Sequence, residues 1–212
     1  MILNISHEFK PRNGGGKKMD TSEIPNIINT IRRDYPVPET SILRLASYFK
    51  KHAFSPGHLL TSPGITDRHV YFIESGCTRT YFIAKEKEVT NWFSSEGDLT
   101  FSSTSFYHKL PAYEFVEVLE DALIYKISIQ NMEQLFSEDI HLANWSRVLH
   151  QEALLKMQTL RLDRLSLAAN ERYEKFCREN PALLNRVNLG YIASYLGITQ
   201  QYLSNLRAAH RF

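Results

Sequence analysis

The chain has 212 residues and a formal net charge of +2, with 43% hydrophobic and 23% charged residues. These values fit one large or two small globular domains and exclude disorder throughout the chain. Its two cysteines, Cys77 and Cys177, lie 100 positions apart, which argues against a disulfide framework, a zinc knuckle or an iron–sulfur cluster. No run approaches the roughly 18 apolar residues of a membrane span. We expect a cytoplasmic protein with no metal, no other cofactor and no membrane partner.

The N-terminal part divides into a tail and two helices. Residues 1–20 lack a secretory hydrophobic run and are rich in Gly, Lys and Pro, which predicts a mobile tail with either Met1 or Met19 as the native start. From Ser22 to Lys51, apolar residues recur at three- and four-residue spacing, which predicts two amphipathic helices split at Pro36 and Pro38. The apolar residues are Ile24, Ile27, Ile28, Ile31, Ile42, Leu45, Ala46 and Phe49.

The pattern changes from helix to strand at Phe54. Up to Ile129 the chain contains short runs rich in aromatic and β-branched residues, such as HVYFIE, TRTYFIA and YEFVEVLE. Turn sequences such as Ser55-Pro56-Gly57 and Glu96-Gly97-Asp98 separate them. This spacing predicts an antiparallel sandwich or barrel, and we expect a jelly-roll-like β-roll. With its flanking helices, this domain should span residues 21–137.

The next segment predicts one long helix over residues 138–167. It contains no Gly or Pro from Ile140 to Leu167 and has two apolar stripes, so it needs two surfaces to pack against. The β-roll could cover one stripe and a second copy of the chain the other. The alternative is a plain buried helix of a monomer, because Glu152 and Thr159 interrupt the heptad-spaced stripe. The heptad-spaced stripe is Trp145, Val148, Glu152, Leu155, Thr159 and Leu162, and the second is Leu142, Leu149, Ala153, Met157 and Leu160.

Residues 168–212 predict a helix-turn-helix. A helix over about Ala169 to Glu179 should stop before Pro181. In LGYIASYLGITQQYLSNLR, from Leu189 to Arg207, the small Ala193 allows two helices to cross closely, Gly197 supplies the turn, and Thr199 is placed to N-cap the second helix. Any tight helical hairpin would show the same features, so the pattern alone leaves DNA binding open.

The order of these parts, and the segments FSPGHLLTSPGITDRHVYFIESGCTRTYF and RVNLGYIASYLGITQQYLSNLR, resemble the Crp/Fnr family of bacterial transcription regulators. The resemblance covers about Ser22 to Arg207 and is strongest to the short-tailed members common in Bacteroidetes-type genomes. It implies an α+β fold with a cyclic-nucleotide-binding-like β-roll, a dimerisation helix and a C-terminal DNA-binding domain. It also implies a homodimer on double-stranded DNA, with RNA polymerase as a further partner. We expect this C-terminal domain to lack the family's full β-hairpin wing.

In such a motif, the N-terminal residues of the second helix meet base edges in the major groove. The candidate readers are therefore Gln200, Gln201 and Asn205, with Thr199, Tyr202 and Ser204 beside them. Glutamine and asparagine both suit adenine, so we expect half-sites that contain A·T pairs. The candidate phosphate contacts are basic, and each could equally be part of a solvated helix surface. They are Arg186, Arg207, His210 and Arg211.

The family's effector cassette reads roughly G-E-x-x-L, a loop, then R-S/T-A, and its arginine pairs with the phosphate of a cyclic nucleotide. Here the first pair becomes Phe101-Ser102 and the second becomes Ala112-Tyr113, so the arginine is missing. Lys109 or His108 could substitute for it. The pocket should be degenerate or altered and should not bind cAMP, while an unknown small-molecule effector stays open. A polar pocket or a plain turn would both explain the hydroxyls of Ser102, Ser103, Thr104 and Ser105.

Other classes of protein fit less well. A cupin-like jelly roll that binds a metal or a small molecule needs a His-x-His pair, which is absent, and no catalytic motif such as Gly-x-Ser-x-Gly or His-Glu-x-x-His occurs. A β-roll that binds another protein, with structural final helices, is the second alternative. We therefore expect a homodimeric, sequence-specific DNA-binding transcription regulator and no enzyme.

Overall fold

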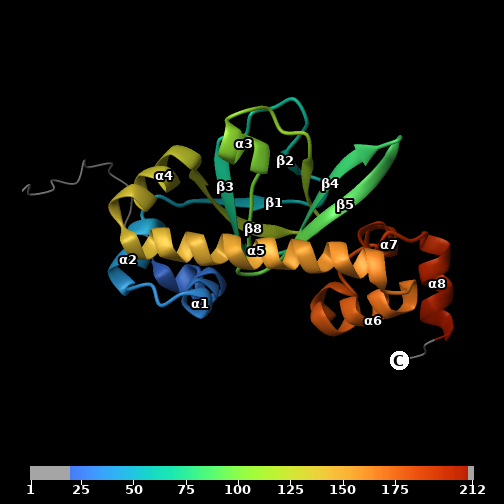
Figure 1. Ribbon diagram of the computed structural model, residues 1–212. Coiled ribbons are helices and arrows are strands. Elements are labelled where there is room, and N and C mark those ends of the chain that lie inside the picture. Colours follow the sequence, from blue (N-terminus) through green and yellow to red (C-terminus); the bar gives the residue numbers. More distant parts are fainter. Residues whose placement is uncertain (1–19, 210–212) are drawn as a thin grey trace, which may run out of the picture.

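The computed structural model describes residues 20–209. It contains an antiparallel β-roll, a long helix along one side of the β-roll, and a helical domain at the C-terminal end (Figure 1). The predicted α+β fold class is therefore confirmed. Apart from Asp20, the tail predicted over residues 1–20 lies outside the described residues.

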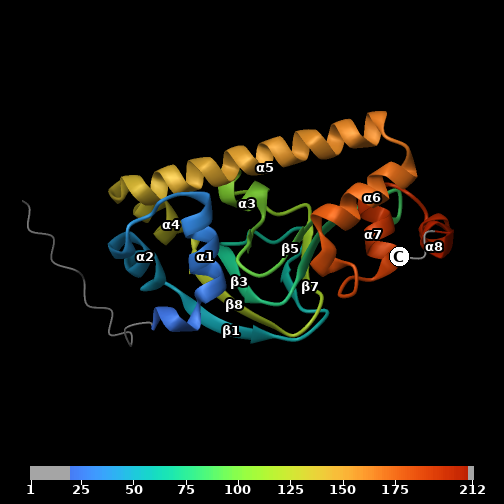
Figure 2. The ribbon, with the colours of Figure 1, turned by 90° about the horizontal axis from the view of Figure 1, so that it is seen from below.

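The N-terminal helices pack under the β-roll (Figure 2). A 3₁₀ turn, η1 (Thr21–Glu23), leads into α1 (Pro25–Asp34) and α2 (Glu39–Ala46). The chain leaves helical geometry between them, around Pro36 and Pro38, as predicted. The prediction of helix up to Lys51 is wrong, because β1 (Lys50–Phe54) begins there and pairs antiparallel with the last strand of the β-roll. Pairing with a distant strand thus overrides the local apolar spacing.

Two four-stranded sheets form the β-roll, in the orders β1-β8-β3-β6 and β2-β7-β4-β5. Residues such as Ile73, Val118 and Ile124, none of them exposed to solvent, form the core of the roll. Strand β5 forms one edge of the second sheet, so its outer backbone groups are open to another partner. The remaining strands are β2 (Leu59–Thr61), β3 (His69–Ser75), β4 (Thr78–Ala84), β5 (Lys87–Ser94), β6 (Leu99–Thr100), β7 (Phe115–Val118) and β8 (Ala122–Ser128).

The turn from β3 into β4 depends on Gly76. Its φ of +103° suits glycine, and a Cβ built there would lie 2.6 Å from the Cβ of Ala122. The turn therefore brings β3 against the start of β8, which closes the roll at the end that faces the C-terminal domain.

Three helices follow or interrupt the strands: α3 (Ser103–His108), α4 (Ile129–Glu138) and α5 (Ile140–Ser166). Helix α5 runs along a whole side of the molecule (Figures 1 and 2). Trp145 on α5 is buried, with its ring 6.2 Å from that of Phe72. This first member of the heptad-spaced stripe therefore packs against its own chain, while Leu155 and Leu162 of the same stripe are exposed.

The C-terminal domain consists of α6 (Ala169–Glu179), a 3₁₀ turn η2 (Pro181–Leu183), α7 (Leu189–Leu196) and α8 (Gln200–Ala209). Its apolar side chains form a core with Cys77 and Phe93 of the β-roll. The domain is thus packed against the β-roll. Within residues 20–209, no helix is both long enough and apolar enough to cross a membrane.

Candidate functional site

Helices α7 and α8 form a tight helix-turn-helix. Asn188 caps α7 by accepting a hydrogen bond from the Gly190 amide at 2.7 Å, and Gly197 ends α7 in the left-handed region with φ of +70°. Thr199 Oγ1 then accepts a hydrogen bond from the Tyr202 amide at 3.2 Å at the start of α8. Ala193 is buried in the core that also contains Leu203 of α8. The turn predicted at Gly197 and the cap predicted at Thr199 are therefore present.

Helix α8 turns its polar side to solvent and its leucines inward. Leu203 is fully buried and Leu206 partly so. The predicted base-reading residues, together with Arg207, lie on the exposed surface of α8 or at its start, and none is covered by the other residues within 20–209. The exposed residues are Thr199, Gln200, Gln201, Tyr202, Ser204, Asn205 and Arg207.

Two of these side chains are paired one helical turn apart. The Nε2 of Gln201 donates to the Oδ1 of Asn205 at 3.2 Å. Within residues 20–209 no hydrogen bond engages the side-chain carbonyl oxygen of Gln201 or the side-chain amide N–H groups of Asn205, so the pair can still accept and donate. An adenine edge offers the complementary pair, the N6 donor and the N7 acceptor.

Gln200 lies over the start of α7. A Cβ built on Gly190 would lie 2.8 Å from the Oε1 of Gln200, so the glycine leaves the space that this side chain uses. Gln200 therefore lies beside the N-terminal turn of α7, whose positive dipole end favours anions.

Arg186 does not join the α8 residues. Its guanidinium donates to both carboxylate oxygens of Glu96, at 3.0 and 2.7 Å, and to the carboxylate of Glu120, at 3.1 and 3.3 Å from Nε. Hydrogen bonds to Glu120 and Glu96 raise the pKa of Arg186. The predicted phosphate contact is thus engaged with the β-roll. His210 and Arg211, the other two predicted contacts beside Arg207, lie outside the described residues.

Helix α7 is also attached to the open edge of β5. The Ser194 Oγ donates to the Glu88 carbonyl and accepts from the Thr90 amide, both at 2.9 Å. Nearby, the guanidinium of the buried Arg79 lies 3.7 Å from the ring centre of Tyr191 and donates to Glu88 at 2.7 Å. A side chain of α7 thus takes the place of a neighbouring strand at this edge.

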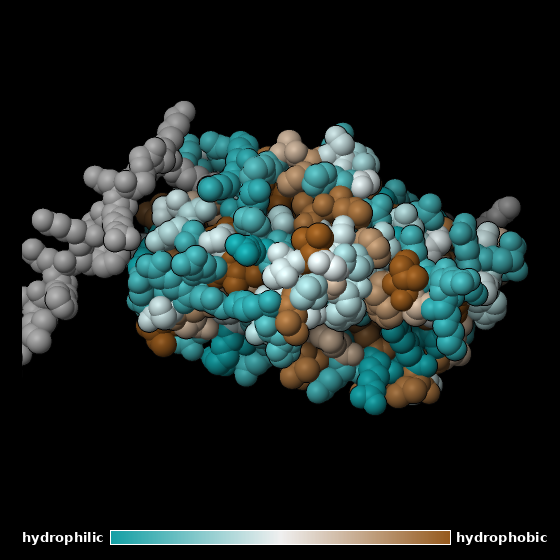
Figure 3. Space-filling view, turned by 90° about the horizontal axis from the view of Figure 1, so that it is seen from above, coloured by the Kyte–Doolittle hydropathy of each residue, from teal (hydrophilic) through white to brown (hydrophobic). Residues whose placement is uncertain are grey.

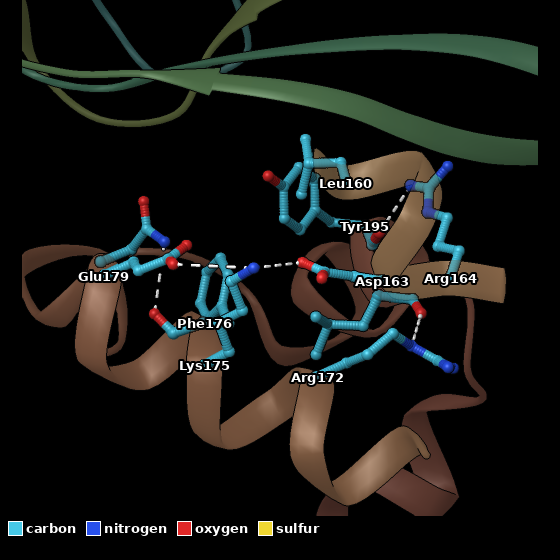
Figure 4. Close-up of a pocket in the computed structure, with 10 residues that line it drawn as sticks. Leu160, Asp163, Arg164, Arg172, Lys175, Phe176, Glu179 and Tyr195 are labelled. Atoms are coloured by element: carbon cyan, nitrogen blue, oxygen red, sulfur yellow. Dashed lines mark hydrogen bonds and ion pairs between the residues drawn. The ribbon is translucent and has the colours of Figure 1, made fainter. Parts of the chain in front are cut away.

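A cavity marks the joint between α5, α6 and the end of α7 (Figure 4). Arg164 of α5 donates to the Tyr195 carbonyl at 2.7 Å, and Arg172 of α6 donates to the Leu196 carbonyl at 3.1 Å. Lys175 pairs with Asp163 at 2.6 Å. The three cations that line the cavity therefore hold protein groups, and two of them satisfy C-terminal carbonyls of α7.

The second half of α5 exposes large apolar side chains. Leu155 is 55% exposed, Leu162 61% and Leu165 75%. They follow one side of the helix, opposite the side that buries Leu142 and packs Leu149 on the core. Figure 3 shows hydrophobic residues between hydrophilic ones along the lower edge, where α5 runs.

The predicted effector residues differ in their contacts and in their burial. Phe101 packs in an aromatic cluster, with its ring 4.9 Å from that of Phe106. Ser102 caps α3 by accepting from the Ser105 amide at 3.2 Å, Ala112 is buried, and Tyr113 is 59% exposed. Ser103 is exposed and Thr104 is partly buried at the start of α3.

Two buried carboxylates, which sequence reasoning missed, lie beside α3. Glu114 accepts from the amides of Ser103 at 3.1 Å and Tyr113 at 3.2 Å. Asp67 accepts from the His69 amide at 3.0 Å and from Tyr71 Oη at 3.2 Å. The sequence could have indicated the burial of Glu114, because side chains alternate between the two faces of a strand. Glu114 lies two residues before the buried Val116 and four before the buried Val118, so it falls on the same face.

Both basic substitutes predicted for this region are exposed at the end of α3. Lys109 pairs with Glu133 of α4 at 2.6 Å, and His108 is exposed. Lys109 also donates to the Phe106 carbonyl of α3 at 2.7 Å, so its ammonium is bonded to protein groups on both sides.

Both cysteines are free thiols, and Cys77 is buried while Cys177 is partly buried. Burial raises the pKa of Cys77 to about 12, so its reactive thiolate form is disfavoured at neutral pH. Among residues 20–209, no three His, Cys, Asp or Glu side chains are grouped to hold a metal ion.

Comparison with known proteins identifies the β-roll. Residues 51–139 match the model of the cyclic nucleotide-binding domain. None of the curated proteins matches the sequence of this chain.

Solved structures share the fold over most of the chain. CLP, the c-di-GMP-responsive global regulator of Xanthomonas campestris, is 14% identical, with a TM-score of 0.68 over 82% of this chain and 92% of its own. A CooA mutant of Carboxydothermus hydrogenoformans is 21% identical, with a TM-score of 0.63 over 88% and 84%. A protein from Eubacterium rectale described as a Crp/Fnr-family transcriptional regulator is 14% identical, with a TM-score of 0.65 over 84% and 88%. At these identities the comparisons show a common fold.

Proposed function

We propose that this chain, which has the fold of the Crp/Fnr regulators, is a sequence-specific DNA-binding transcription regulator. The observation that carries the proposal is the exposed polar surface of α8, presented by a capped helix-turn-helix at the end of a long helix. A β-roll that only bound another protein would not need this surface uncovered. In this proposal residues 21–137 form the β-roll, 138–167 the dimerisation helix and 168–212 the DNA-binding domain.

The exposed apolar side of α5 supports a homodimer. Leu155, Leu162 and Leu165 are large, exposed and spaced along one side, and a second copy of the helix would bury them. A two-fold dimer would present two α8 helices to major grooves about 34 Å apart. A dimer makes the DNA contacts of one subunit twice, so it binds the paired half-sites more tightly than a monomer binds one.

The contacts of Glu114 support the proposal that the β-roll does not bind a cyclic nucleotide. Glu114 accepts hydrogen bonds from the Ser103 and Tyr113 amides, in the segment that corresponds to the family's phosphate-binding cassette. Such backbone donors would otherwise be available to complete a phosphate cage. The carboxylate uses them internally and repels an anion in the same place.

We therefore expect 1 mM cAMP to leave the melting temperature of the protein unchanged. A ligand present at 100 times its Kd would stabilise the fold by about 2.7 kcal/mol, which is readily measured as a rise in Tm. Differential scanning fluorimetry with and without cAMP, and with adenosine as the uncharged control, checks this. A rise with cAMP and none with adenosine would show that the phosphate is bound after all.

The proposed function is tested by the binding of the purified protein to duplex DNA over a salt series. A DNA-binding regulator should bind, and its affinity should fall steeply as salt rises, because phosphate contacts release counterions. Metal analysis of the same sample addresses the cupin-like alternative. Absence of DNA binding at low salt would favour the protein-interaction alternative.

A further inference from the structure

Arg186 joins the C-terminal domain to two turns of the β-roll. It comes from the loop before α7, while its partners Glu96 and Glu120 lie in the turns after β5 and β7. The guanidinium binds Glu96 through two nitrogens in the fork geometry that fixes direction as well as distance. Glu96 also accepts from the Gly76 amide at 2.9 Å, which ties the ion pair to the closing turn of the roll.

Burial and charge agree with a structural role for this cluster. Partial burial alone would raise the pKa of Glu96, but hydrogen bonds from Arg186 and from backbone amides bring it below its ordinary value. Val187, the next residue, is buried in the core that the domain shares with Cys77 and Phe93. The loop is therefore held by an ion pair and an apolar anchor side by side.

Further contacts restrain rotation of the domain. Ser194 binds the edge of β5, and Phe93 and Tyr195 pack with ring centres 5.4 Å apart. At the far side, Arg164 holds the end of α7 to α5. The domain is thus attached to β5, to the turns that hold Glu96 and Glu120, and to α5. These attachments give α7 a defined direction relative to the β-roll and to α5.

None of these contacts covers α8. Its exposed residues remain open to solvent while α7 and the preceding loop are attached to the β-roll. The attachment therefore leaves the proposed reading surface accessible, which an inhibitory contact would not do.

We propose that Arg186 is a positioning residue: through Glu96 and Glu120 it fixes the orientation of α8 relative to α5, and so selects the distance between the two half-sites that a dimer reads. The inference rests on the proposed function. It assigns to Arg186 a role in selecting the spacing of the site, in place of the phosphate contact predicted from sequence.

The first test needs no DNA. Hydrogen exchange of the wild type is compared with Arg186→Gln, with the double variant Glu96→Gln/Glu120→Gln, and with Arg178→Gln, an exposed arginine of α6, as the matched control. The Thr90 amide, which donates to Ser194, should exchange at least about fivefold faster in the two cluster variants and normally in the control. Unchanged exchange at Thr90 would overturn the proposed attachment. If Arg186→Gln fails to fold, Glu120→Gln alone keeps the Glu96 pair and serves instead.

The second test uses duplexes with identical half-sites whose spacing changes in single base-pair steps around one helical turn. We expect the wild type to prefer one spacing, and both cluster variants to lose at least about fivefold of that preference while binding a single half-site as before. If Arg186 were a phosphate contact, Arg186→Gln alone would weaken half-site binding and reduce the salt slope by about one, and the glutamate variants would not. That result, or an unaltered spacing preference, would overturn the inference. Failure of the wild type to bind any duplex would instead refute the proposed function, while exchange at Thr90 still decides the attachment.

Discussion

The double variant Gln201→Ala/Asn205→Ala should lose specific DNA binding and keep its fold. The two side chains are exposed on α8 and bond only to one another among the hydrogen bonds found in the structure, so truncation removes no core contact. A good bidentate base contact contributes about 1–3 kcal/mol of discrimination, and a dimer makes it twice, or about 2–6 kcal/mol. Affinity for the preferred site should therefore fall by at least roughly 30-fold, toward that for random DNA.

Fluorescence anisotropy with the preferred and a scrambled duplex measures this loss, and circular dichroism checks the fold. Gln130→Ala, an exposed amide of α4 remote from the C-terminal domain, is the matched control and should bind as the wild type does. Equal affinities of the double variant and the wild type for the preferred duplex would show that α8 does not read the bases through this pair.

Leu162→Glu should convert the protein to monomers and weaken DNA binding with it. Burial of a leucine in a dimer seam contributes about 1.5–3 kcal/mol, and the seam would contain two copies, so the change removes about 3–6 kcal/mol. Dimer dissociation should rise at least roughly 100-fold, and a monomer reaches only one half-site. Sedimentation velocity over a concentration series, followed by DNA binding, measures both effects.

Ile65 offers a close control for this experiment. It is 61% exposed, the same fraction as Leu162, but it lies in a loop of the β-roll. Ile65→Glu introduces the same charge on an equally exposed apolar residue and should leave the dimer intact. Dimers of unchanged strength in Leu162→Glu would mean that this side of α5 is not the subunit contact.

Local signals explain what the sequence could predict. The spacing of apolar residues, the turn at Gly197 and the cap at Thr199 act within a few residues, so the helix-turn-helix could be predicted closely. The β-roll could be predicted from turn chemistry and from strands rich in aromatic and β-branched residues. Helix α3 was not predicted, since its hydroxyl-rich sequence fits a turn equally well.

Long-range contacts explain the features that the sequence could not predict. Arg186 looked like a DNA contact, because its partners Glu96 and Glu120 are 90 and 66 positions away in the chain. Trp145 matched a heptad seam, yet the fold buries it against Phe72. In the β-roll, Glu114 was missed although the alternation of β7 places it on the buried face.

Selection of bound duplexes from a fully randomised pool by the wild-type protein, at physiological salt, tests the central claim most directly. The pool should be enriched in one inverted repeat, with half-sites that contain A·T pairs and lie about one helical turn apart. Enrichment of a single, unpaired G-rich element, or no enrichment over the starting pool, would contradict a dimeric regulator that reads DNA through Gln201 and Asn205.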